Sequence, residues 1–171
     1  MLPITWLIRL EEPADDPAIE KLHAEAFGPG RFARTAFRIR EGIAHDPRLS
    51  FVGLINGEVA GAVRLTPIMI GESGAQLLGP LAVAPAYKNK GLGRALVRTS
   101  LEAAAAAGET MVLLVGDEPY YGPLGFRRTP LGTVTLPGPV DPARVLVACL
   151  NGAAMPTGAV RGGRRRGPAM A

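Results

Sequence analysis

Hydrophobic residues follow helical spacing in some stretches of the chain and short strand-like runs in others. Residues 4–10 form an apolar, β-prone run and predict a first strand. Residues 16–27 predict a helix, because an acidic residue and Pro17 stand at its start and apolar side chains recur on one face. Residues 31–42 predict a second helix whose arginines face outward.

The middle of the chain predicts a meander of three strands. Residues 50–55 and 59–70 are strand-like and are joined by Asn56-Gly57, the strongest short signal for a hairpin turn. Residues 76–83 form a further apolar run and predict the third strand. These strands are expected to lie side by side in one sheet.

A long helix and further strands complete the pattern. Residues 91–107 predict an amphipathic helix that ends at Gly108, and residues 111–115 predict a short strand buried on both faces. A short helix and two late strands, residues 133–136 and 145–150, follow. This order predicts an α/β (α+β) fold in which helices flank one central sheet.

Composition bounds this domain and its partners. We expect it over residues 1–150, because Gly, Pro, Ala and Arg dominate residues 151–171 and predict a loose C-terminal extension with at most one more packed segment. Four of the 19 basic residues lie within residues 161–171, and without them 15 basic residues balance 15 acidic ones. Nucleic acid is therefore an unlikely partner of the domain, since such binding needs a basic surface.

The remaining composition predicts a cytoplasmic protein. A single cysteine, Cys149, excludes an intrachain disulfide and fits a reducing compartment. The N-terminus lacks the basic start and apolar core of a signal peptide. No apolar run approaches the roughly 18 residues that a spanning helix needs, so we expect no membrane partner.

The turn that leads into the long helix carries the most chemical information. Gly91 and Gly93 stand in its first turn, where each glycine costs up to about 1 kcal/mol relative to alanine, so a close approach to the backbone is the expected reason. The free N–H groups of a helix start attract anions, and Lys88, Lys90 and Arg94 add positive charge. Spacing alone also fits a plain connecting loop, because an isolated Gly-x-Gly is a weak signal.

Two motifs resemble those of a known family. The run from Lys88 to Arg94, Lys-Asn-Lys-Gly-Leu-Gly-Arg, resembles the acetyl-coenzyme A signature of the GNAT N-acetyltransferases, Gln/Arg-x-x-Gly-x-Gly/Ala. Residues 116–126 resemble the later Tyr-x-x-x-Gly-Phe element of that family, and residues 136–141 look like those of a bacterial subgroup of predicted acetyltransferases. Lys88 departs from the usual Gln or Arg, because lysine keeps the charge but not the bidentate fork.

The resemblance implies the GNAT fold, a central mixed and mostly antiparallel sheet with splayed middle strands, flanked by helices. It also implies acetyl-coenzyme A as co-substrate, an amine as acceptor, and no metal. The edge contacts to the pantetheine arm would come from Leu81, Ala82 and Val83. The pyrophosphate would lie on the turn formed by Lys88, Asn89, Lys90, Gly91, Leu92, Gly93 and Arg94.

Tyr121 matches the tyrosine of the later motif and is the candidate acid that protonates the departing thiolate. Its structural alternative is an aromatic side chain packed beside Phe126.

The general base is not identified by the sequence. Asp117 and Glu118 are near Tyr121 in sequence but fit an N-cap or a solvated acid. His23 lies on the apolar stripe of its helix. His45 could reach an acceptor cleft, and a water chain would serve equally well.

Two other functions fit the same residues. One is a catalytically idle acyl-coenzyme-A-binding regulatory module, and the other is a nucleic-acid or ribosome binder that uses the arginine-rich tail. The sequence leaves the acceptor amine open, and it leaves a homodimer as an open alternative to a monomer.

Overall fold

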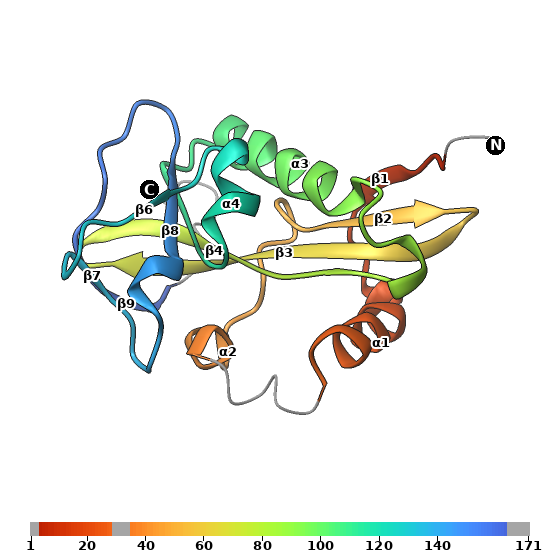
Figure 1. Ribbon diagram of the computed structural model, residues 1–171, viewed down its shortest axis with the longest axis horizontal. Helices are drawn as coiled ribbons and strands as arrows, with labels where there is room; N and C mark the ends of the chain where they lie inside the picture. The colour runs from red at the N-terminus through yellow and green to blue at the C-terminus, as the bar shows by residue number, and fades with distance from the viewer. Residues whose placement is uncertain (1–3, 29–34, 164–171) are drawn as a thin grey trace, which may run out of the picture.

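The computed structural model describes residues 4–28 and 35–163 of the 171-residue chain. Within these residues the strands form one nine-stranded sheet with the order β1-β2-β3-β4-β5-β8-β6, while β9 pairs with β3 and β7 (Figure 1). The strands are β1 (Leu7–Leu10), β2 (Phe51–Ile55), β3 (Glu58–Ile70), β4 (Ser73–Val83), β5 (Met111–Val115), β6 (Arg127–Arg128), β7 (Val134–Thr135), β8 (Val145–Cys149) and β9 (Gly158–Gly162). The helices are α1 (Asp16–Phe27), α2 (Thr35–Arg40), α3 (Leu92–Ala106) and α4 (Glu118–Tyr121).

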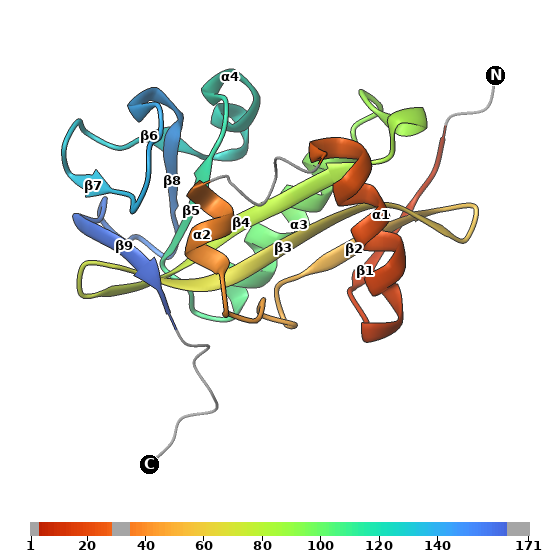
Figure 2. The same cartoon turned by 90° about the horizontal axis from the view of Figure 1, so that it is seen from below.

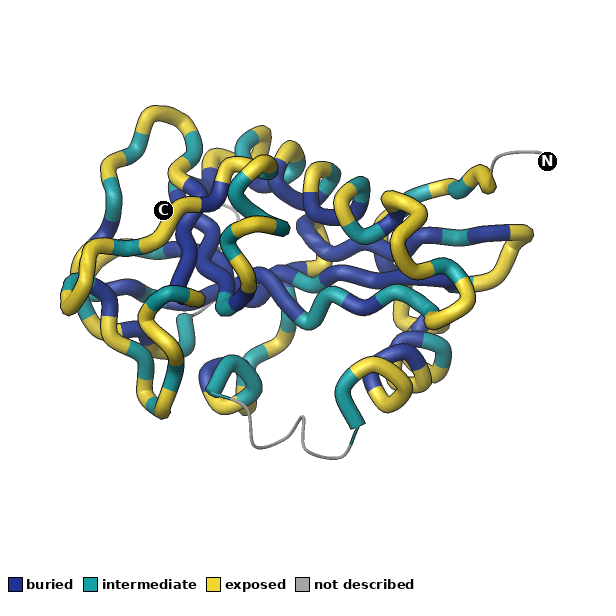
Figure 3. The backbone as a smooth tube through the Cα atoms, in the orientation of Figure 1, coloured by how far each residue is buried: buried dark blue, intermediate teal, exposed yellow. Residues whose placement is uncertain are grey.

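The sheet is mixed and mostly antiparallel, as the resemblance implied. Strands β1 to β4 form an antiparallel meander, β4 and β5 are parallel, and β5 and β8 are antiparallel. Helix α3 covers one face, whereas α1 and α2 lie on the other, as the two perpendicular views show (Figures 1 and 2). The buried residues follow the middle strands between these helices (Figure 3).

Helix α3 lies close against the sheet because two glycines face it. A Cβ atom at Gly53 would lie 2.6 Å from Leu92 Cδ1, and one at Gly61 would lie 3.0 Å from Leu96 Cδ1. The two leucines are almost fully buried, on the helix face that the sequence spacing predicted. This close contact holds the first turn of α3 beside the end of β4.

The middle strands separate toward their carboxyl ends. The parallel ladder between β4 and β5 consists of Gln76↔Val112 and Leu77↔Leu113, and among the described residues no further pair of these two strands follows it. Both strands nevertheless continue, so they leave an open wedge between residues 78–83 of β4 and residues 114–115 of β5.

A bulge in β4 lies at the opening of this wedge. The register between β3 and β4 shifts between Val63 and Leu65, which leaves Gly79 and Pro80 opposite a single residue of β3. Pro80 has no N–H to donate to a neighbouring strand. The bulge thus lies just past the last residue pair of the β4–β5 ladder.

Several boundaries differ from those expected. β1 begins at Leu7, because the residues before it have no partner in the ladder with β2. Helix α2 spans Thr35–Arg40, and residues 31–34 of the expected helix lie outside the described residues. Strand β9 continues the sheet past the boundary expected at residue 150, as the one further packed segment, and Val160 is 4% exposed. Residues 164–171 of the expected extension lie outside the described residues.

Among the helices of the described residues, none is long and apolar enough to cross a membrane.

Candidate active site

The turn before α3 has the backbone geometry of an anion site. Asn89 has a φ of +62° and Gly91, the N-cap of α3, has a φ of +96°, so the chain turns sharply through left-handed conformations. No side chain caps this N-terminus, so its first N–H groups remain available to a ligand. The cationic side chains of Lys88, Lys90 and Arg94 are exposed around it. This arrangement combines free donors with positive charge.

The end of β4 presents its backbone to the wedge. The N–H of Ala84 donates to the carbonyl of Ala60 on the β3 side, at 2.8 Å. Successive N–H groups of a strand point to opposite edges, so the N–H groups of Leu81 and Val83 point away from β3 and into the wedge. An extended ligand between β4 and β5 could therefore pair with the backbone of Leu81 and Val83. Ala82 is buried, and its backbone pairs with Ala62 of β3.

A cavity of about 590 Å³ lies on the opposite face, between α1, α2 and the open ends of β4 and β5. Its walls include polar side chains, among them His45, Arg64 and Tyr120, and apolar ones from α1 and α2 such as Phe27 and Phe37. The wedge residue Leu81 also lines the cavity. The cavity therefore reaches the wedge from one face while the turn before α3 approaches it from the other.

Two adjacent tyrosines of α4 stand at this junction. The Tyr121 ring packs edge-on against Phe126, with centroids 5.9 Å apart, and its edge rests on Gly116. Tyr120 extends toward the start of α3 instead, and the Arg94 guanidinium lies 5.3 Å from its ring centroid. Both tyrosines line the cavity, so the sequence motif and the geometry bring them together.

Burial controls the acidity of both phenols. It raises the pKa of Tyr121 to about 12, with smaller contributions from Tyr120 and Asp117. It also raises the pKa of Tyr120, although the Arg94 charge opposes this effect. Each hydroxyl is therefore protonated at neutral pH and can donate a proton or a hydrogen bond.

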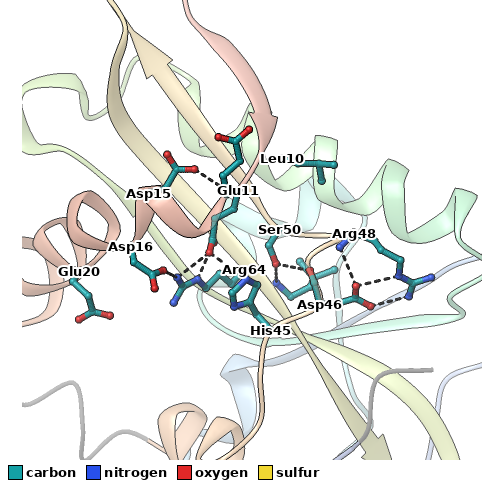
Figure 4. A network of polar contacts seen from close by, with 12 residues as sticks. Leu10, Glu11, Asp15, Asp16, Glu20, His45, Asp46, Arg48, Ser50 and Arg64 are labelled. Carbon is teal, nitrogen blue, oxygen red and sulfur yellow. Dashed lines mark hydrogen bonds and ion pairs between the residues drawn. The ribbon is translucent and has the colours of Figure 1, made fainter. Parts of the chain in front are cut away.

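Glu11, His45 and Arg64 form an ion cluster (Figure 4), and the last two of these residues line the cavity. The Glu11 carboxylate accepts two hydrogen bonds from Arg64, both at 2.9 Å, and lies 3.1 Å from Nε2 of His45. Burial alone would raise the pKa of Glu11, but the hydrogen bonds from His45 and Arg64 outweigh it and lower the pKa to about 2. His45 was a candidate base from the sequence, but no motif links it to Glu11 and Arg64, which come from separate segments of the chain.

The carboxylates near Tyr121 in sequence have structural partners. Asp117 lies 3.2 Å from the Arg144 guanidinium, and Glu118 lies 3.1 Å from that of Arg128. Asp117 is the N-cap residue of α4, yet its side chain makes no capping hydrogen bond. His23 is buried on α1, in agreement with its predicted place on the apolar stripe.

Among the described residues, no group of three or more His, Cys, Asp or Glu side chains is arranged to hold a metal ion.

Comparisons with known proteins agree with this architecture. The acetyltransferase (GNAT) family matches residues 17–126. The uncharacterized N-acetyltransferase YhbS of Escherichia coli K12 is 33% identical over 126 residues, which cover 70% of this chain and 72% of that protein.

Two solved structures share the fold over nearly the whole chain. The crystal structure of Escherichia coli YhbS in complex with CoA has a TM-score of 0.77 and 27% identity, and the match covers 95% of this chain and 92% of that one. A GNAT family acetyltransferase from Brucella melitensis in complex with acetyl-CoA has a TM-score of 0.70 and 28% identity, with 92% and 95% covered.

Proposed function

This chain belongs to the acetyltransferase (GNAT) family, and we propose that it transfers the acetyl group of acetyl-coenzyme A to an amine by direct attack on the thioester. The observation that carries this proposal is the open wedge between β4 and β5. It joins an anion-binding turn on one face to a cavity on the other, as transfer between two substrates requires.

The cofactor is proposed to lie along the turn and the wedge. Backbone N–H groups of Asn89, Gly91, Gly93 and Arg94 bind the pyrophosphate, and the cations of Lys88 and Lys90 surround it. The pantetheine arm then enters the wedge as an extra strand, paired with the backbone of Leu81 and Val83, with Ala82 behind it. The bound complexes of the two structural relatives support this cofactor, and the outward N–H groups of β4 support the path.

The chemistry follows from the groups at the end of the wedge. A neutral amine in the cavity attacks the thioester carbonyl, and the N–H of Val83 stabilises the oxyanion. As the carbon–sulfur bond breaks, the Tyr121 hydroxyl donates its proton to the thiolate. The Tyr121 phenol is protonated at neutral pH, as a proton donor must be, although its raised pKa of about 12 makes transfer to a thiolate less favourable than from an ordinary phenol.

The test is thiol release from acetyl-coenzyme A across amines, amino acids, aminoglycosides and peptides. Turnover with at least one acceptor class, accompanied by the acetylated product, is the expected result. Tight binding of acetyl-coenzyme A without turnover on the whole panel would instead indicate the catalytically idle binding module.

A further inference from the structure

We propose that His45 is the general base that removes a proton from the acceptor ammonium, and that Glu11 is a positioning residue that orients its imidazole. This inference rests on the proposed acetyl transfer, since it assigns a residue to one step of that reaction. His45 lines the cavity, Glu11 contacts its imidazole at 3.1 Å, and neither residue belongs to the turn before α3.

The geometry fixes which nitrogen of His45 is basic. Nε2 lies 3.1 Å from Oε2 of Glu11, whose carboxylate stays ionised because Arg64 binds both of its oxygens. A carboxylate at this distance accepts the Nε2 proton, so the lone pair of the neutral ring is on Nδ1. The Glu11 side chain is 3% exposed while that of His45 is 29% exposed, so the orienting group is buried and the imidazole reaches the cavity.

The segment that carries His45 is held against β3 by the residues that follow it. The N–H of the next residue, Asp46, donates to the carbonyl of Leu65 in β3 at 2.7 Å. Ser50 Oγ donates to the Asp46 carbonyl at 2.8 Å and accepts from the Leu65 N–H at 3.2 Å. Figure 4 shows this support beside the Glu11 cluster. An imidazole on so fixed a segment has the preorganisation that proton transfer requires.

Other ionisable groups of the cavity are less suited to this step. Glu20 and Asp117 have side chains that are 61% and 74% exposed, and solvated carboxylates are weak bases near neutral pH. Arg64 does not oppose a proton on His45, because Glu11 and Asp16 both bind it. The charged and titratable groups around His45 and across the cavity are Glu11, Asp16, Glu20, His23, Arg40, Arg64, Asp117, Tyr120, Tyr121 and Arg144.

The protons of the reaction balance with this assignment. Nδ1 of His45 takes a proton from the ammonium, and the amine that results attacks the acetyl carbon. When the carbon–sulfur bond breaks, the thiolate takes the proton of Tyr121. The new amide nitrogen gives up its second proton, which restores Tyr121 through solvent, and His45 releases its own proton to solvent. One ammonium and one thioester thus give one amide, one thiol and one proton.

The experiment compares two acceptors of matched shape but different basicity. One is the alkylamine that the wild-type protein acetylates fastest, which is an ammonium at pH 7, and the other is its alkoxyamine isostere, which is neutral there. His45→Gln keeps an amide donor for Glu11 but cannot take up a proton. In His45→Gln, we expect kcat/KM for the alkylamine to fall about 100-fold or more, and its pH profile should lose the titration limb of the wild-type profile. For the alkoxyamine, kcat/KM should fall less than about fivefold.

Two further variants separate basicity from structure. Glu11→Gln removes the carboxylate that accepts the Nε2 proton and orients the imidazole, so it should lower kcat/KM for the alkylamine more than kcat/KM for the alkoxyamine. Arg48→Gln breaks the Arg48–Asp46 ion pair in the same segment, at 2.7 Å, without touching His45, and should leave the pH profile unchanged. If His45→Gln fails to fold, His45→Ala provides the test. Added imidazole should restore turnover of the alkylamine by this variant.

Failure of the base assignment and failure of the proposed function would give different results. Equal losses on both acceptors, a retained wild-type limb in His45→Gln, or an unrescued but folded His45→Ala would overturn the assignment of the base. A wild-type protein that acetylates no amine would instead refute the proposed function itself.

Discussion

The hydroxyl oxygen of Tyr120 lies so close to Gly93 that a Cβ atom on this glycine would stand 2.8 Å from it. Gly93 belongs to the first turn of α3 and Tyr120 to α4, so the contact joins the start of α3 to the cavity wall. The missing side chain therefore serves two purposes. It admits the Tyr120 hydroxyl, and it leaves the N–H groups of the helix start open to an anion.

Gly93→Glu should abolish most cofactor binding. The new side chain adds bulk and a negative charge where the pyrophosphate is proposed to lie, so calorimetry should show a loss of about 100-fold or more in affinity for acetyl-coenzyme A. The matched control is Arg98→Glu on the same helix, which is exposed and lies one turn further from the N-terminus. Arg98→Glu changes the net charge by more than Gly93→Glu does, yet it should weaken acetyl-coenzyme A binding by less. If a folded Gly93→Glu protein bound acetyl-coenzyme A with wild-type affinity, the proposed pyrophosphate site would be wrong.

Tyr121→Phe should slow the chemical step and spare binding. The ring that packs on Phe126 is kept and only the hydroxyl is lost, so kcat should fall about 100-fold while the affinity for acetyl-coenzyme A changes little. Rapid-quench kinetics with the best acceptor measure this directly. Tyr120→Phe makes the same chemical change at the neighbouring ring and should cost clearly less. If Tyr120→Phe had the larger effect on kcat, the acid would be Tyr120 and our assignment would be wrong.

The Glu11 cluster should make the protein's stability depend on acid pH. The folded pKa of Glu11, about 2, lies below its ordinary value of 4.5, so its contribution to stability is complete above about pH 4.5 and disappears as the pH falls toward 2. Urea unfolding should show that Glu11→Gln lowers the free energy of unfolding by roughly 1–3 kcal/mol at pH 7 and by much less near pH 2.5. The control Glu12→Gln changes a side chain that is 65% exposed and should have little effect at either pH. A pH-independent loss in Glu11→Gln would show that the contribution is not electrostatic.

Strand β9 should contribute to stability although it follows the expected end of the domain. Val160 is 4% exposed and belongs to the cluster with Ile68 and Ile70, so Val160→Asp should lower the free energy of unfolding by roughly 2–4 kcal/mol. Its neighbour Ala159 is exposed on the same strand, and Ala159→Asp should cost less than about 1 kcal/mol. Equal denaturation midpoints for the two variants would mean that β9 does not pack on the sheet in solution.

The sequence by itself determined the elements whose geometry is local. Asn56-Gly57 predicts its hairpin turn because both residues accept a positive φ, and they have φ values of +52° and +79°. The apolar stripe of α3 and the glycine turn before it were predicted for the same reason, since helical spacing and left-handed glycines involve only neighbours in the chain. Tyr121 was found through its fixed distance from Phe126 in a motif, although its role remains a proposal.

Tertiary structure alone decided the features that join distant segments. Glu11, His45 and Arg64 lie in three separate stretches, and only the antiparallel register of β1, β2 and β3 brings their side chains into one cluster. The pairing of β9 with β3 depends likewise on a long-range contact, and the short, Gly-rich segment around Val160 has no pattern that predicts it. No periodicity encodes such contacts, because their free energy comes from hydrogen bonds and burial that exist only after the chain has folded.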